Sequence, residues 1–217
     1  MSKNILAFNS SLFCCSISLL YQGNIYNKIK KCNKNQIVHI LPMIQTMLKE
    51  NYIDLHEIEI IAISTGPGNF IGIRTSIAIA QGLSLGLNVP IASFPTPLIL
   101  AEEAYNTFNK HRIIMIMKTN NKNVYLEKYT KNKDKIWTKK KSKKTFSIQE
   151  IYEKLSYLKK TWILVGDIFG IKSTEVHKNL IISNIQFPKS QFIITLYLSN
   201  KYYQKYSFSY KIFPRYF

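Results

Sequence analysis

The sequence GPGNFIGIR, residues 66–74, joins a predicted strand to a predicted helix and decides the fold. The run before it, Glu59–Thr65, is short, apolar and β-branched, which is typical of a strand buried on both faces. The run after it, from Ile71 to Gly86, carries apolar residues at helical spacing beside small residues spaced by four, Ala78, Gly82 and Gly86. A strand that passes through a glycine-rich loop into a helix is the building unit of an α/β sheet.

The loop places free backbone N–H groups at a helix N-terminus, where they can face an anion or a closely approaching chain. Glycine permits positive φ, proline stiffens the turn, and an arginine adds a charged fork. The candidate loop residues are Gly66, Pro67, Gly68, Asn69, Phe70, Gly72 and Arg74. No G-K-[ST] follows, and the spacing is not G-x-G-x-x-G. The loop alone therefore leaves open a phosphate or partner site and an ordinary strand-to-helix turn.

Three antiparallel strands and a helix are predicted upstream of the loop. Polar residues 9–11 and Gly23-Asn24 mark turns between strands at Ile5–Phe8, Cys14–Tyr21 and Ile25–Lys30. An amphipathic stripe predicts a helix from Ile37 to Asn51, and a further strand is expected at Ile91–Phe94. This order predicts a mixed sheet flanked by helices.

A second lobe is predicted to begin near residue 100. Helices are expected at 98–108 and 147–157 and strands at 113–117, 124–130, 136–137 and 162–165, and the patterns fade beyond Gly170. Eight lysines between Lys131 and Lys144 predict a solvated hairpin, with a dedicated binding site as the alternative. The tail from Tyr197 to Phe217 mixes nine aromatic residues with basic ones. It is expected to pack on the second lobe, with stacking on single-stranded RNA as the alternative.

The net charge of +18 would attract nucleic acid, anionic membranes or acidic proteins. However, 27 of the 30 basic residues are lysine, and the arginines are Arg74, Arg112 and Arg215. Proteins that recognise phosphates and base edges favour arginine over lysine. Both a functional and a purely compositional origin of the charge therefore stay open. The three cysteines form no C-x-x-C, and no apolar run reaches membrane-spanning length, so a cytoplasmic protein is expected.

No set of residues suited to catalysis or metal binding stands out. The histidines at 39, 56, 111 and 177 are scattered and are predicted to be surface or satisfied residues. The pair Glu102-Glu103 is predicted to lie on a solvated helix face, and Asp167 follows a strand without a visible partner.

Four stretches resemble the TsaB (YeaZ) family in order and spacing. They are ILAFNSS near the N-terminus, ILPMIQ at 40–45, ISTGPGNFIGIR at 63–74 and IAIAQGLSLGLNVPI at 77–91, and the likeness covers roughly residues 4–105. The resemblance implies an actin-like or Hsp70-like ATPase fold of two lobes built on an RNase H-like sheet. The expected lobes are residues 1–100, with the loop and the pairing helices, and residues 101–217, smaller, divergent and degenerate.

The resemblance also implies a function. TsaB-like proteins are regarded as non-catalytic subunits that pair with TsaD and engage the ATPase TsaE, so that adenosine 37 is threonylcarbamoylated in tRNAs reading codons that begin with A. No cofactor of its own is expected, ATP and Mg²⁺ being expected only in the assembled complex, and tRNA contact is expected to be indirect. A homodimer of the isolated chain is expected to be possible. The expected partner interface consists of Ile40, Leu41, Met43, Ile44, Met47, Ala78 and Gly82, with the domain's own core as the alternative place for these side chains.

The chain departs from the family pattern in ways that move away from catalysis. Asn9 stands where the family usually has an Asp that could hold Mg²⁺, and Asn69 and Ile71 replace two hydroxyl residues of the loop. Gln36 stands where a His is common, and residues 118–120 replace a D-A-R-like stretch. The alternative function is a free-standing ATP-dependent phosphotransferase of the sugar or acetate kinase kind, in the same fold superfamily.

Overall fold

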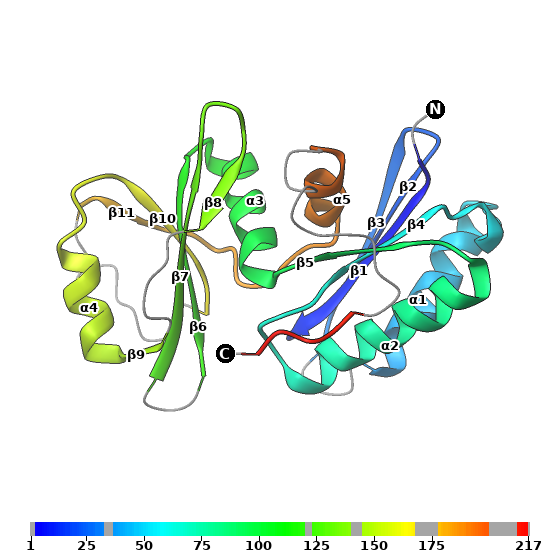
Figure 1. Ribbon diagram of the computed structural model, residues 1–217, viewed down its shortest axis with the longest axis horizontal. Helices are drawn as coiled ribbons and strands as arrows, with labels where there is room; N and C mark the ends of the chain where they lie inside the picture. Colours follow the sequence, from blue (N-terminus) through cyan, green and yellow to red (C-terminus); the bar gives the residue numbers. More distant parts are fainter. Residues whose placement is uncertain are drawn as a thin grey trace. The chain divides into compact units, whose positions relative to one another are not determined.

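The computed structural model describes residues 3–32, 37–119, 123–139, 145–167, 178–199 and 212–216. The chain forms two compact units, and Figure 1 shows their elements. Unit 1 comprises residues up to Ile99 together with Phe187–Tyr216, and unit 2 comprises Leu100–Gln186. The chain therefore divides next to residue 100, but the expectation that residues 101–217 form one lobe is wrong, because the C-terminal part returns to unit 1.

Unit 1 contains a five-stranded mixed sheet in the order β3-β2-β1-β4-β5. The strands β1, β2 and β3 pair antiparallel, whereas β4 joins β1 and β5 joins β4 in parallel. Their bounds are Ile5–Leu12, Cys14–Tyr21, Asn24–Lys31, Ile60–Ser64 and Ile91–Phe94. The antiparallel meander followed by parallel strands is the expected RNase H-like arrangement, so the predicted fold class is confirmed.

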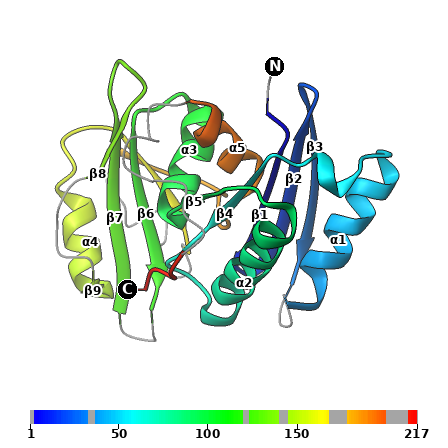
Figure 2. The same cartoon turned by 45° about the vertical axis from the view of Figure 1, so that its right-hand side comes forward.

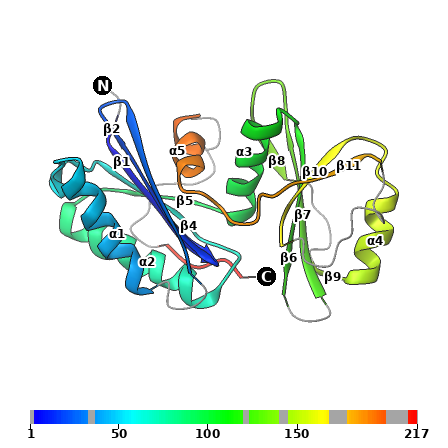
Figure 3. The same cartoon turned by 180° about the vertical axis from the view of Figure 1, so that it is seen from behind.

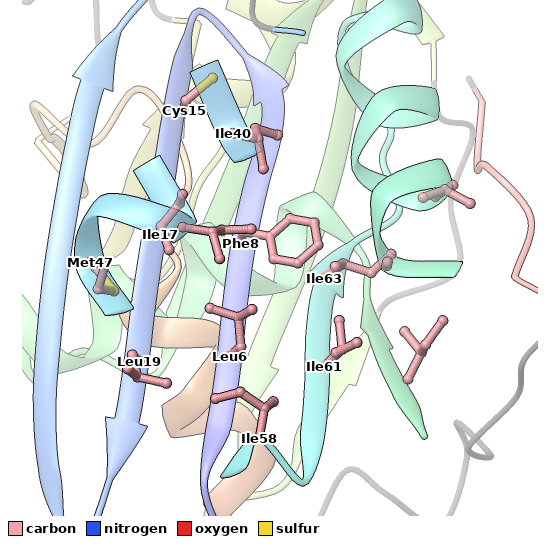
Figure 4. Close-up of a cluster of buried hydrophobic side chains, with 14 of the residues drawn as sticks. Leu6, Phe8, Cys15, Ile17, Leu19, Ile40, Met47, Ile58, Ile61 and Ile63 are labelled. Carbon is pink, nitrogen blue, oxygen red and sulfur yellow. The ribbon is translucent and has the colours of Figure 1, made fainter. Parts of the chain in front are cut away.

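Two helices cover one face of this sheet, namely α1 (Ile37–Glu50) and α2 (Phe70–Leu87), as Figure 2 shows. A short 3-10 helix, Leu55–Glu57, precedes β4. In Figure 4, Ile40 and Met47 of α1 lie over Phe8, Ile17 and Leu19 of the sheet. These side chains are buried because successive strand residues alternate between faces, which places every second apolar residue under the helices.

Helix α5 (Gln191–Leu198) covers the opposite face, where it packs on β1, β2 and β4 (Figure 3). Its N-cap Ser190 is fully buried and lies 2.8 Å and 2.7 Å from the hydroxyl oxygens of Ser16 and Ser18 on β2. The side chains of Ile193 and Ile194 are buried as well. The sheet thus needs α5 to shield its second face, which is the physical reason for the return of the chain to unit 1.

Strand β1 extends through the residues that were predicted to form a turn. Asn9, Ser10 and Ser11 are buried, and a register shift lies between Asn9 and Leu12. Polar residues are tolerated there because their side chains find partners inside the unit, whereas the sequence pattern treats them as solvent-facing. The turn itself lies at Phe13, which is exposed.

Unit 2 repeats the strand order of unit 1. Its sheet runs β11-β10-β6-β7-β8, with β9 paired to β7. Strand β7 is antiparallel to β6 and to β8, whereas β10 is parallel to β6 and β11 to β10. The bounds of β6 to β11 are Arg112–Lys118, Asn123–Lys131, Trp137–Lys139, Thr145–Ser147, Trp162–Gly166 and Leu180–Ile182. The sequence patterns missed β9 and β11, each of three residues, so the second lobe keeps the arrangement of the first with short outer strands.

Two further helices were predicted close to their observed bounds. Helix α3 (Thr96–Phe108) crosses the division between the units, and α4 (Ile148–Ser156) belongs to unit 2. Ser147 and Glu150 form a capping box at the start of α4, as the sequence predicted.

A buried ion pair in unit 2 corrects two predictions of solvent exposure. Lys131 Nζ lies 2.8 Å from Glu102 Oε2, and each side chain is only 4% exposed. Trp137 Nε1 also donates to Glu102, at 2.6 Å, and the Lys131 ammonium lies 3.8 Å from the ring centre of Tyr105. Glu102 and Glu103 are both buried, so they do not form a solvated face, and Lys131 is not part of an exposed lysine run.

Candidate functional site

The loop at 66–69 is held by contacts with β1 that leave no room for larger residues. Gly66 has φ 99°, so it uses the conformational freedom predicted for it. A Cβ atom on Gly68 would lie 2.1 Å from the carbonyl oxygen of Ser11, so this glycine is required by close approach. The main-chain N–H of Asn69 donates to the same Ser11 oxygen, at 2.5 Å. The loop is therefore fixed against the end of β1.

Main-chain polar groups in the first turn of α2 are hydrogen-bonded by side chains of Asn69 and Ser10. The Asn69 side chain caps the helix, accepting a hydrogen bond from the N–H of Gly72 at 3.1 Å. The Ser10 hydroxyl donates to the Gly72 carbonyl at 2.8 Å and also contacts the Ser76 hydroxyl. Asn69 thus performs the capping function that a Ser at this position could also perform.

Asn9 is fully buried beside this loop, and both ends of its amide are used. Its Nδ2 donates to the Pro188 carbonyl at 3.1 Å, and its Oδ1 accepts from the Ser11 N–H at 3.0 Å. An amide is suited to this place because it both donates and accepts, whereas a carboxylate would only accept. Asn9 therefore links β1 to the segment that returns from unit 2.

The C-terminal segment Ile212–Tyr216, red in Figure 1, lies along the loop and along α2 as far as Gln81. The N–H of Arg215 donates to the Thr65 carbonyl at 2.8 Å, and a Cβ atom on Gly66 would lie 2.5 Å from the Arg215 carbonyl oxygen. Ile212 is buried in the core of unit 1, and its carbonyl accepts from Gln81 Nε2. The expectation that the tail packs on the second lobe is wrong for this segment.

Three side chains join the C-terminal segment to α2. The rings of Phe70 and Tyr216 stack with centres 5.6 Å apart, and the guanidinium carbon of Arg74 lies 3.9 Å from the Phe70 ring centre. Arg74 Nε donates to the Tyr216 hydroxyl at 2.9 Å. All three side chains are nevertheless exposed. The guanidinium is therefore oriented on the surface by a ring and a hydroxyl.

The residues expected at a partner interface divide into two groups. Ile40, Ile44 and Met47 are at most 3% exposed and belong to the core of unit 1, so a partner cannot contact them and their assignment to an interface is corrected. Met43 is half-buried against the same core. Leu41, Ala78 and Gly82 are exposed, and their contact with a partner stays a prediction.

Exposed residues of α2 form one continuous line that we call the α2 stripe. It consists of Ile71, Arg74, Ala78, Gly82 and Leu85. These positions follow at steps of three, four, four and three, so they share one helix face. Ile71 is 56% and Leu85 75% exposed, although both are apolar. Ile71 and Leu85 were not predicted as interface residues, although the same helical spacing contains them.

No contact within the described part of the chain requires a glycine in the α2 stripe. A Cβ atom on Gly82 or on the neighbouring Gly86 would meet nothing within 4 Å. Glycine in a helix interior costs about 1 kcal/mol relative to alanine. Among the described residues, α2 is also the one helix that is long and apolar enough to cross a membrane, and 33% of it is buried. Core helices of soluble proteins pass the same test of length and composition. Apart from Arg74, the stripe is thus a surface of apolar and small residues, and nothing in the described part of the chain requires its glycine.

Within the described ranges, no group of three or more His, Cys, Asp and Glu side chains gathers as a metal site would require. The described histidines, at 39, 56 and 111, are at least partly exposed. Burial raises the pKa of both Cys14 and Cys15 to about 12, which keeps these thiols protonated at neutral pH. Predictions for Gln36, Asn120, Lys140–Lys144, His177 and residues 200–211 fall outside the described residues.

Comparison with known proteins gives a consistent set of relatives. Residues 24–163 match the family described as TsaD, tRNA N6-adenosine threonylcarbamoyltransferase. The chain is 42% identical over its full length to the tRNA threonylcarbamoyladenosine biosynthesis protein TsaB of Buchnera aphidicola subsp. Baizongia pistaciae, covering 98% of that protein. It is 28% identical to TsaB of Escherichia coli K12, over 75% of this chain and 70% of that protein. The fold matches YeaZ from Pseudomonas aeruginosa with a TM-score of 0.82 at 20% identity, over 100% of both chains.

Proposed function

We propose that this chain, which belongs to the TsaB family, takes part in tRNA threonylcarbamoyladenosine synthesis as the subunit that pairs with TsaD. In this proposal the chain itself catalyses no reaction. TsaD, together with the ATPase TsaE, threonylcarbamoylates adenosine 37 of tRNAs that read codons beginning with A. The protein acts in the cytoplasm, and ATP and Mg²⁺ belong to the assembled complex.

The α2 stripe is the observation that carries the pairing proposal. Two exposed apolar side chains, Ile71 and Leu85, stand at the ends of the stripe, and the small residues Ala78 and Gly82 lie between Arg74 and Leu85, with open space beside the glycine. Small residues permit a second helix to approach closely, and exposed apolar surface favours association. Helix α1 lies beside α2 on the same face of the sheet (Figure 2), and two of its apolar side chains, Leu41 and Val38, are exposed. We assign these two helices as the surface on which TsaD is bound.

The contacts around the loop at 66–69 support a non-catalytic function for this subunit. The amide of Asn9 is used on both sides, so it is committed to structure. The carbonyl oxygen of Arg215 stands against Gly66, on the loop that a phosphate would have to approach. A carbonyl oxygen beside Gly66 repels a phosphate because both carry negative charge or partial charge. The loop thus serves to hold α2 in position, and the isolated chain is expected to show no Mg²⁺-dependent ATP turnover above background.

Co-elution of the purified chain with TsaD of the same organism tests the pairing surface. Ala78→Arg places a long cation in the middle of the α2 stripe and is expected to abolish co-elution. Tyr157→Arg is the matched control, because Tyr157 is 82% exposed in unit 2 and its replacement adds the same charge elsewhere. Co-elution that survives Ala78→Arg would remove this surface from the proposal. Complementation of a strain lacking its own TsaB, scored by the modified nucleoside in tRNA, tests the pathway itself.

A further inference from the structure

Arg74 is the single charged residue of α2 and lies within the α2 stripe, between Ile71 and Ala78. Lysine is the usual cation of this chain, and only three of the 30 basic residues are arginine. Arg74 uses properties that a lysine lacks, since its planar guanidinium stacks on Phe70 while Nε donates to Tyr216. The arginine is thus built into a defined geometry.

The guanidinium keeps binding capacity after these contacts. An arginine has five N–H donors, and the Nε–H alone is used by Tyr216. Within the described residues no carboxylate lies within ion-pair distance of Arg74, and α2 contains no acidic residue. An oriented, exposed fork with its outer donors unused fits a planar anion, because fixing the side chain beforehand reduces the entropy lost on binding.

We propose that Arg74 is a specificity-determining residue that binds a carboxylate of the partner subunit seated on the α2 stripe, and that Tyr216 is its positioning residue. This inference rests on the proposed function, because it uses the same helix as the docking surface. A carboxylate is favoured over an RNA phosphate because the residues on either side of Arg74 in the stripe are apolar or small, whereas a surface that binds RNA carries a row of cations.

The C-terminal segment is thereby part of the binding surface. Tyr216 stacks on Phe70 and holds Nε, and the main chain of Arg215 fixes the segment to the end of β4. A tyrosine in this place defines the rotamer of Arg74 before the partner arrives. Residues about 140 positions apart in sequence thus combine into one recognition element.

The test measures the dissociation constant for TsaD of the same organism at low and at high salt. Arg74→Gln keeps a planar, polar end group on an aliphatic stem but removes the charge, so affinity is expected to fall by about tenfold or more and its salt dependence to flatten. Tyr216→Phe keeps the ring stack and the Arg74 charge, so affinity is expected to fall by about threefold with the salt dependence retained. Arg112→Gln, in unit 2, is the control with the same net charge and is expected to bind as the unmodified protein does.

Each outcome decides the inference separately from the proposed function. Wild-type affinity and salt dependence in Arg74→Gln, with binding abolished by Ala78→Arg, would overturn the arginine assignment and leave the pairing surface intact. Unchanged binding in both variants would overturn the pairing surface as well. If Arg74→Gln weakens binding of the isolated chain to tRNA and leaves TsaD binding unchanged, a phosphate is the ligand and the inference is wrong. Thermal unfolding of the variants verifies that weaker binding does not arise from unfolding.

Discussion

Replacing Asn9 by Asp tests whether the amide at this position is structural. Asn9 is fully buried, donating to the Pro188 carbonyl at 3.1 Å and accepting from the Ser11 N–H at 3.0 Å. An ionised Asp keeps the second bond but turns the first into a contact between two oxygen acceptors. A protonated Asp restores both bonds, because its O–H can donate to Pro188. The variant is therefore expected to hold a proton in the folded state.

The loss of folding stability in Asn9→Asp follows from the proton that the folded state must keep on the Asp side chain. An Asp in the unfolded chain has a pKa of about 3.9, so holding the proton at pH 7 costs about 4 kcal/mol, at about 1.4 kcal/mol for each pH unit. The folded-state pKa is raised, so the full stability is present below about pH 4 and is lost as pH rises towards the folded pKa. At pH 5 the expected loss is about 1.5 kcal/mol.

Urea unfolding followed by far-UV circular dichroism at pH 5, 6 and 7 measures this difference. Asn9→Ala is the control, because it removes both hydrogen bonds without adding a titratable group, and its cost is expected to be independent of pH. An Asn9→Asp protein that is as stable as the original at pH 7, or equally destabilised at pH 5 and pH 7, would refute the argument. The variant is also expected to gain no ATP turnover, which separates the proposed function from the phosphotransferase alternative.

Three further predictions concern single positions. Gly82→Ala fills open space on a helix, so it is expected to raise the stability by about 1 kcal/mol in thermal unfolding and yet to weaken TsaD binding in the co-elution assay. Lys131→Met leaves the buried Glu102 carboxylate without its cation and is expected to cost about 3–5 kcal/mol by urea unfolding followed through tryptophan fluorescence, whereas adding Glu102→Met should recover part of that loss, because Trp137 Nε1 then loses its acceptor. Gly68→Ala forces a Cβ atom to within 2.1 Å of the Ser11 carbonyl oxygen and is expected to destabilise by about 3 kcal/mol in the same kind of unfolding measurement, and a stability equal to that of the original would contradict the close approach.

Burial of polar groups was the part of the structure that sequence patterns misjudged. Glu102 and Lys131 were expected in solvent, and Asn9 was expected in a turn, because a charged or polar side chain is exposed unless a partner is present. The partners lie far away in the chain, 29 positions for the ion pair and 179 for Asn9 and Pro188. A local pattern contains no information about such partners, so the default of exposure was wrong at these positions.

The sequence by itself determined the order of the elements up to β10 except β9, and the strand–loop–helix unit around Gly66, because periodicity, glycine spacing and capping act over a few neighbouring residues. The four motif stretches also indicated the family. Tertiary structure alone decided which apolar residues of α1 and α2 are inside: Ile40 and Met47 enter the core, while Ile71 and Leu85 remain on the surface. It also decided that the C-terminal residues return to unit 1. The physical reason is that the sheet a helix meets decides which of its faces is buried, and α2, whose apolar residues lie on all sides and whose one charged residue is Arg74, does not specify that face by its own pattern.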